Sequence, residues 1–287
     1  DRAAYANHRY ELVLTDLASG RTRVLDRSPI HRIAGLAWSP DGRWIAYGLE
    51  EERQKVSLWI CEAATGRRHR VTRGALKDLS PVFDPEGRYL YFLGYRQFNP
   101  VYDQMHFDLG FPGGMRPYLV TLRKDLRSPF LPEPKAAEKK PDKETKKKTP
   151  VRIDFDGIER RILPFPVPEG RYAQIGALKN GAVFSAVPIQ GLRENLLRDD
   201  DAPKAKLVAY AFDARKPETL VDGIGSFELS ADAGTLYYTS GGRLRAVKAG
   251  EKPDEKHEDD PPGKKSGWID LARVRIGVEP PREWAQM

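Results

Sequence analysis

Short apolar segments, each bounded by turn residues, recur along most of the chain. In the clearest unit, an apolar segment over residues 33–38 is followed by Ser-Pro-Asp-Gly and then by a second apolar segment over residues 44–48. Such runs predict β-strands, and Pro and Gly at the second and fourth turn positions favour a type I turn between them. Two more segments, at 56–61 and 68–72, complete a predicted four-stranded antiparallel unit.

The third predicted strand of this unit is apolar on both faces. Leu58 and Ile60 point to one side, and Trp59 and Cys61 point to the other, because side chains alternate along a strand. A sheet with one face in water would alternate apolar and polar residues. The pattern therefore predicts a sheet that is packed between two neighbouring sheets.

The unit repeats along the chain. The stretch from Ser39 to Tyr47 has a close counterpart 45 residues later, from Asp84 to Phe92. A period of about 40–45 residues, with a tight turn followed by a short apolar strand, is typical of a β-propeller blade. The predicted fold is therefore all-β, a partial β-propeller of about four and a half four-stranded antiparallel blades.

The repeat weakens further on but still places the remaining strands. Residues 179–181, Lys-Asn-Gly, join two of them as a hairpin, because Asn-Gly favours a type I′ turn. The other predicted strands are 10–17 and 22–25 in a first half blade, then 79–83, 89–93, 118–123 and 151–164, then 173–178, 182–187, 207–212 and 219–221, and finally 226–230, 236–239, 243–247 and 268–278.

The propeller is expected to cover residues 1–278. Segments 132–150, 195–206 and 250–267 are rich in charged residues and proline, and they predict disordered surface inserts. Residues 279–287 predict the first turn of a helix that begins a following domain. Because the first half blade has no matching half blade at the other end, we expect the chain to be a piece of a larger propeller.

Composition excludes several classes of partner. Residues 132–150 carry +3 of the net charge of +7, with seven Lys against four acids. The remaining charge is spread out, without the aromatic and basic groove of single-strand binders, so no nucleic-acid partner is expected. No apolar run approaches the roughly 18 residues of a membrane span, so no membrane partner is expected either. The single cysteine, Cys61, excludes an intramolecular disulfide and fits a reducing compartment.

The sequence offers few catalytic motifs. It contains no Gly-x-Ser-x-Gly nucleophile elbow and no His-x-x-x-His pair. Asp103, His106 and Asp108 are of metal-ligand type, but they lie in a Gly- and Pro-containing loop, where such residues commonly hydrogen-bond to the backbone. We therefore predict no catalytic residue, no metal site and no cofactor, and we interpret Cys61 as a buried, inert thiol.

Three segments resemble the second propeller of tricorn-type proteases. They are residues 107–123, residues 154–172, which begin Asp-Phe-Asp-Gly-Ile-Glu-Arg-Arg, and residues 266–284, with Trp268 and Trp284 near their ends. The Ser-Pro-Asp-Gly turns are shared by many propellers, whereas the ordered series of three segments is more specific. The resemblance covers most of the chain from about residue 30 onward.

The resemblance implies a large multidomain serine peptidase that degrades oligopeptides. In that family two propellers precede a PDZ-like module and a catalytic domain, and this propeller would be a non-catalytic gate or channel for the substrate. The family's catalytic groups lie in the later domains and match no residue here. The implied partners are oligopeptides and the PDZ-like and catalytic domains of the same chain; we expect a homo-oligomer in the cytoplasm, with the periplasm as the alternative.

Arg160 and Arg161 are the candidate substrate-guiding residues, because arginine binds peptide carboxylates through paired hydrogen bonds. If they lie in a strand, only one of them can face a given side, and salt bridging is the alternative role. Two other functions stay open. One is a stand-alone protein- or peptide-binding propeller, of the periplasmic translocation type or a scaffold. The other is a prolyl-type oligopeptidase, which a downstream Gly-x-Ser-x-Gly would reveal.

Overall fold

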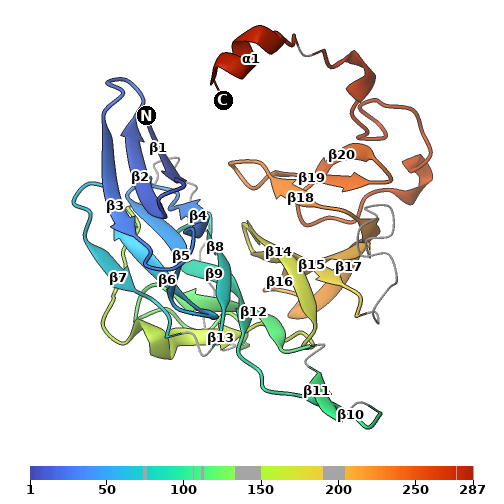
Figure 1. The fold of residues 1–287 in the computed structure, drawn as a ribbon. Coiled ribbons are helices and arrows are strands. Elements are labelled where there is room, and N and C mark those ends of the chain that lie inside the picture. Colours follow the sequence, from blue (N-terminus) through green and yellow to red (C-terminus); the bar gives the residue numbers. More distant parts are fainter. Residues whose placement is uncertain are drawn as a thin grey trace, which may run out of the picture.

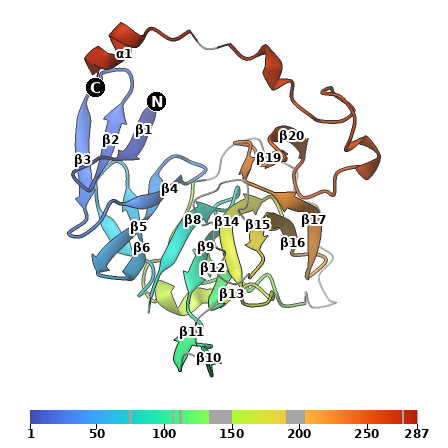
Figure 2. The same ribbon diagram turned by 45° about the vertical axis from the view of Figure 1, so that its right-hand side comes forward.

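The structure, a computed structural model, describes residues 1–73, 76–105, 107–110, 113–132, 150–189, 204–275 and 277–286. Five antiparallel sheets stand side by side in chain order around a central space, which is open between the first and the last sheet (Figures 1 and 2). This arrangement confirms the predicted all-β partial propeller.

Three of the sheets have the four strands of a complete blade, and the first and last sheets have three. In chain order the sheets are β1 (Arg2–Ala6), β2 (Glu11–Asp16) and β3 (Thr22–Arg27); β4 (Ala34–Trp38), β5 (Trp44–Glu52), β6 (Lys55–Glu62) and β7 (Arg68–Arg70); β8 (Asp78–Phe83), β9 (Tyr89–Tyr95), β12 (Met115–Thr121) and β13 (Ile162–Pro164); β14 (Arg171–Leu178), β15 (Gly181–Val187), β16 (Ala205–Ala211) and β17 (Lys216–Ile224); and β18 (Phe227–Leu229), β19 (Thr235–Ser240) and β20 (Arg243–Lys248).

The repeated turn joins the first and second strands of two consecutive sheets. Gly42 N–H donates to the Ser39 carbonyl, and Gly87 N–H donates to the Asp84 carbonyl, each at 2.8 Å. Both glycines adopt left-handed backbone conformations, with φ of 69° and 67°. Residues with a Cβ atom rarely adopt this conformation, so glycine is favoured at both positions. The two predicted turns are thus confirmed.

Four apolar clusters form the core, and each lies between two consecutive sheets. The strand β6 contributes to two of them. Leu58 and Ile60 pack toward the third sheet, whereas Cys61 packs toward the first sheet with Trp59 beside it. A strand that is apolar on both faces therefore does lie inside a stack of sheets, as its sequence predicts.

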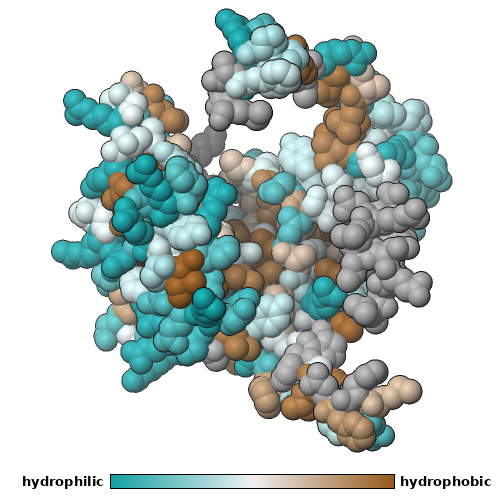
Figure 3. Space-filling model, viewed as in Figure 1, coloured by the Kyte–Doolittle hydropathy of each residue, from teal (hydrophilic) through white to brown (hydrophobic). Residues whose placement is uncertain are grey.

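A hairpin that the repeat did not predict interrupts the third sheet between β9 and β12. Its strands are β10 (Val101–Asp103) and β11 (Asp108–Gly110), and it projects from the body of the molecule at the bottom of Figure 1. The side chains of Val101, Tyr102 and Phe107 are more than half exposed. Apolar atoms consequently gather on this projection in Figure 3, at the lower edge of the view.

The prediction of one strand over residues 151–164 was wrong for most of its length. Gly157 takes a left-handed φ of 66°, and a 3₁₀ helix, η1 (Ile158–Arg161), follows it. Extended pairing is restricted to β13. The Ile158 N–H donates to the Phe155 carbonyl at 3.1 Å and closes a turn that leads into η1, so the chain cannot continue there as a strand.

The predicted last strand over residues 268–278 was also wrong. Only a single bridge joins Trp268 to Arg245, and a second 3₁₀ turn, η4 (Leu271–Arg273), follows. The Asp270 carboxylate accepts a hydrogen bond from the Ala272 N–H and so caps that turn, as Asp commonly does. The helix predicted near the C-terminus is present as α1 (Pro280–Gln286), and a following domain stays a prediction.

The expectation of a disordered insert over residues 250–267 does not agree with the structure. The segment contains the 3₁₀ helix η3 (Glu255–His257) and packs around Trp268. The Trp268 indole N–H donates to the Glu258 carbonyl at 2.8 Å, and Arg245 Nε donates to the Ser266 carbonyl at 2.7 Å. These hydrogen bonds hold in place a segment whose composition alone predicts a disordered surface insert. The inserts predicted at 132–150 and 195–206 lie largely outside the described residues.

Candidate functional site in the central space

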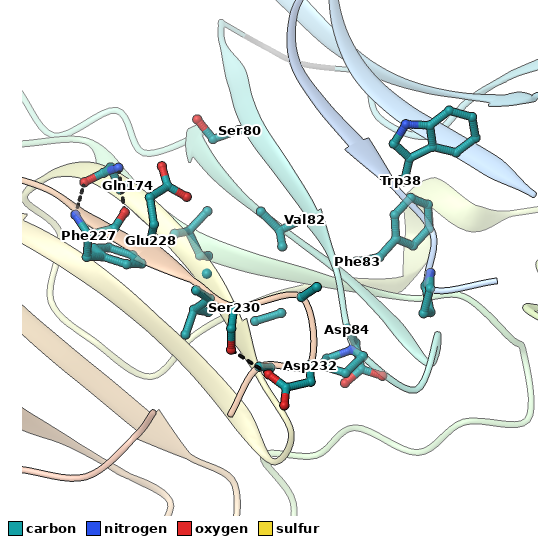
Figure 4. A pocket seen from close by; sticks show the side chains of 18 of the residues that line it. Trp38, Ser80, Val82, Phe83, Asp84, Gln174, Phe227, Glu228, Ser230 and Asp232 are labelled. Atoms are coloured by element: carbon teal, nitrogen blue, oxygen red, sulfur yellow. Dashed lines mark hydrogen bonds between the residues drawn. The ribbon is translucent and has the colours of Figure 1, made fainter. Parts of the chain in front are cut away.

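The first strands of three sheets line a cavity of about 610 Å³, here named the inner-strand cavity. These strands are β8, β14 and β18, which stand at the inner edges of the third, fourth and fifth sheets, and Trp38 and Pro40 of the second sheet complete the wall. Figure 3 shows the hollow between the sheets from outside, and Figure 4 shows the cavity from close by.

Bulges shape the inner strands. Pairing shifts between Leu79 and Val82 in β8, and β4 and β14 have comparable irregularities. A bulge re-aims side chains and bends its strand. At the bulge of β4, a Cβ on Gly35 would lie 2.9 Å from Cδ of Pro81, so glycine allows the second and third sheets to approach closely there.

One side chain joins two of the sheets at the rim of the cavity. Gln174 Oε1 accepts a hydrogen bond from the Phe227 N–H at 3.0 Å, and Gln174 Nε2 donates to the Phe227 carbonyl at 3.2 Å (Figure 4). The amide thus pairs with the backbone of β18 as a neighbouring strand would. This contact fixes β14 relative to β18 and with it the width of the cavity.

Replacing Gln174 by alanine is expected to lower the free energy of unfolding by about 1–3 kcal/mol, because two hydrogen bonds of about 0.5–1.5 kcal/mol each are lost. Hydrogen exchange at the Phe227 amide measures the effect locally, and chemical denaturation measures it globally. The matched variant Gln174→Glu keeps the acceptor for the Phe227 N–H. Its free energy of unfolding should lie between those of the unchanged protein and the alanine variant. Unchanged exchange at Phe227 in the alanine variant would contradict this role.

Carboxylates supply the charge of the inner-strand cavity. Glu228 and Asp232 are exposed and line it from β18 and the turn that follows. The Ser230 hydroxyl donates to Asp232 Oδ1 at 2.6 Å, and the Gly234 N–H donates to the same oxygen at 3.0 Å. These hydrogen bonds hold the pKa of Asp232 below its ordinary value, so this carboxyl is ionised at neutral pH.

Asp84 occupies the turn position that Ser39 and Ser230 occupy in their own sheets, and it also lines the cavity. Its side chain is fully buried, and its Oδ2 accepts a hydrogen bond from the Arg88 N–H at 2.9 Å. Its Oδ1 has no hydrogen-bond partner within the described part of the chain. Burial raises the pKa of the Asp84 carboxyl, although the Arg88 guanidinium opposes that shift.

No Lys, Arg or His is found among the described residues that line this cavity. Arg88 lies behind the wall, where its Nε is shared between Asp84 and Glu86 at 3.4 and 3.1 Å. Lys179 lies close enough to Asp232 to contribute to the lowering of its pKa. The cavity therefore combines an apolar wall, to which Val82 and Phe227 contribute, with acidic groups.

The structure places Arg160 and Arg161 away from this cavity. Both belong to η1, which leads into β13, the outermost strand of the third sheet. The Arg161 guanidinium donates to the backbone carbonyls of Thr121, Leu122, Asp154 and Asp156. Arg160 is exposed. The inner-strand cavity is instead built from residues that the sequence analysis did not single out.

The other candidates from the sequence have simple positions. Cys61 is fully buried and free, and burial, with a smaller contribution from Asp26, raises the pKa of its thiol to about 11. His106 and the side chains of Asp103 and Asp108 lie outside the described part of the chain. Over the described ranges, no group of three His, Cys, Asp or Glu side chains could hold a metal ion.

Fold and cavity together define a β-propeller domain whose inner strands line an axial site. The sequence from residue 1 to residue 250 matches the family model described as the tricorn protease second beta propeller domain. The chain belongs to this family. Among the described residues, no helix has both the length and the apolar character needed to cross a bilayer.

Similar proteins support the assignment along nearly the whole chain. Tricorn protease homolog 1 of Streptomyces coelicolor is 35% identical over 303 residues, which cover 100% of this chain and 27% of that protein. The tricorn protease homolog of Saccharolobus solfataricus is 34% identical over 98% of this chain and 25% of its own length. The crystal structure of the tricorn protease superposes with a TM-score of 0.76 at 21% identity, over 95% of this chain and 25% of that one. The chain thus spans about a quarter of the length of these curated relatives.

Proposed function

We propose that this chain is the non-catalytic propeller portion of a tricorn-like serine peptidase and that it admits oligopeptides through the inner-strand cavity. The observation that carries the proposal is a concave site lined by the first strands of three sheets, in a chain of the tricorn propeller family. The cavity volume of about 610 Å³ lies within the range of about 300–1,000 Å³ that suits a small ligand.

A passage of this kind selects by size. The inner strands of the third, fourth and fifth sheets cannot separate without breaking the apolar clusters between these sheets. In a closed ring, such a wall would admit an extended or short peptide and exclude a folded domain. The proposed chemistry of the whole protein is acyl transfer from the peptide to a serine and then to water. It would take place in catalytic and PDZ-like domains elsewhere in the longer polypeptide, in a cytoplasmic homo-oligomer.

The proposal predicts that this chain binds a short fluorescent peptide without cleaving it. Fluorescence anisotropy measures binding, and release of a fluorogenic leaving group measures cleavage. An active-site serine probe should not label the chain. Turnover that persists through purification, together with labelling by the probe, would overturn the non-catalytic assignment, and absence of peptide binding would overturn the channel.

A further inference from the structure

We propose that the exposed carboxylates of the inner-strand cavity, Glu228 and Asp232, bind primary ammonium groups of a peptide. This inference rests on the proposed channel function. It adds that the channel selects substrates by their positive charge. The ammonium can come from the amino terminus or from a lysine side chain, and the chemistry at the cavity is the same.

The acidic groups stand at both ends of an apolar wall. In Figure 4, Glu228 is drawn at the same end of the cavity as Ser80 and Gln174, whereas Asp232 and Asp84 are drawn toward the opposite end. An ammonium group has three donors and no acceptor, so it needs carboxylate, hydroxyl or carbonyl oxygens around it. Glu228 and Asp232 offer exposed carboxylates, and both can be reached from the cavity.

Asp84 provides a second, independent observation. Its side chain is fully buried, it lines the cavity, and its Oδ1 has no hydrogen-bond partner among the described residues. Unpartnered buried oxygens are uncommon in folded proteins. The equivalent side chain of the fifth sheet, Ser230, is fully used, since it donates to Asp232 and accepts from the Thr235 N–H. The unpartnered Oδ1 leaves the acceptor capacity of Asp84 incompletely used at the cavity wall, in addition to the exposed carboxylates of Glu228 and Asp232.

Among the described residues that line the cavity, no basic side chain competes with a bound ammonium group. Arg88 is engaged by Asp84 and Glu86, and its Nη2 donates to the Lys179 carbonyl at 3.4 Å. A cationic end and an apolar body would therefore meet complementary surfaces in the same cavity. Peptides that carry neither an amino terminus nor a lysine would meet only the apolar wall.

Calorimetric titration of the chain with three matched hexapeptides tests the inference. All are carboxyl-terminal amides of alanine, phenylalanine and glycine: one has a free amino terminus, one is acetylated, and one is acetylated but carries a lysine. The free peptide should bind about tenfold more tightly than the acetylated one, a difference of about 1.4 kcal/mol. This difference should shrink as salt is added. If the acetylated peptide with lysine binds as tightly as the free peptide, the site accepts either ammonium group. If it binds as weakly as the acetylated peptide without lysine, the site accepts only the amino terminus.

Variants assign the effect to the cavity. In Glu228→Gln and Asp232→Asn the preference for the free peptide should fall severalfold, and Asn at 232 can still accept from Ser230 and Gly234, so the turn is kept. The control Glu218→Gln removes an exposed carboxylate on β17 that does not line the cavity. It should leave the preference unchanged.

The outcomes separate the two proposals. Equal binding of free and acetylated peptides, with no effect of Glu228→Gln or Asp232→Asn, would overturn the ammonium site while leaving the channel intact. Absence of binding by all three peptides would overturn the channel function itself and the ammonium site with it. A preference that the control variant also abolishes would place the ammonium site elsewhere and contradict the inference.

Discussion

Replacing Phe165 by alanine is expected to lower the free energy of unfolding by about 3–5 kcal/mol, as truncation of a fully buried aromatic residue does. Phe165 is completely buried between the third and fourth sheets. Its ring centroid lies 5.1 Å from that of Phe130, 5.5 Å from that of Tyr210 and 5.7 Å from that of Tyr91. Truncation would leave a void that the neighbouring rings fill poorly, because Tyr210 and Tyr91 are held by the strands β16 and β9.

Chemical denaturation of the unchanged protein and of Phe165→Ala measures the loss in free energy of unfolding. Phe165→Leu keeps most of the apolar volume and should lose clearly less than the alanine variant. Trp284→Ala removes a larger side chain that is 75% exposed on α1, and it should change stability by less than about 0.5 kcal/mol. A loss at Phe165→Ala no larger than at Trp284→Ala would show that this cluster does not hold the third and fourth sheets together.

The blades could be predicted because their signal is local. The turn residues from Ser39 to Gly42 and from Asp84 to Gly87 form their hydrogen bonds within a few positions of sequence, so the repeat is enough to place them. The two apolar faces of β6 are also readable from alternation alone. Where a single residue decides the local backbone, as Gly157 does before η1, the apolar pattern predicts a strand that does not form.

The candidate site could not be predicted because its residues come from strands of different sheets. Gln174 forms hydrogen bonds with the backbone of Phe227 in the neighbouring sheet. No pattern in the sequence around either residue predicts this contact. One signal was available. Aligning the repeated turns places Asp84 and Ser230 at the same position, and the strands that precede them are the inner strands of their sheets. The side-chain chemistry of Arg160 and Arg161 fits a peptide carboxylate but carries no information on whether they lie at an inner strand.

Removing Arg96 is expected to destabilise the chain by about 3–5 kcal/mol, because it would leave a buried carboxylate without its partner. Asp78, the first residue of β8, is fully buried. Arg96 Nε and Nη2 donate to its two oxygens at 2.8 and 2.6 Å, a bidentate geometry that lysine cannot reproduce. The guanidinium also lies 5.3 Å from the ring centroid of Phe92 and 5.5 Å from that of Tyr118.

A double-mutant cycle by chemical denaturation measures the coupling between these two residues. Arg96→Leu alone should show the full loss, because the carboxylate at Asp78 stays buried, and Arg96→Lys should recover only part of it. Adding Asp78→Asn to Arg96→Leu removes the unpaired charge and should restore stability relative to Arg96→Leu alone. If the two substitutions instead add without coupling, the contribution of Arg96 comes from its packing on Phe92 and Tyr118 and not from the ion pair.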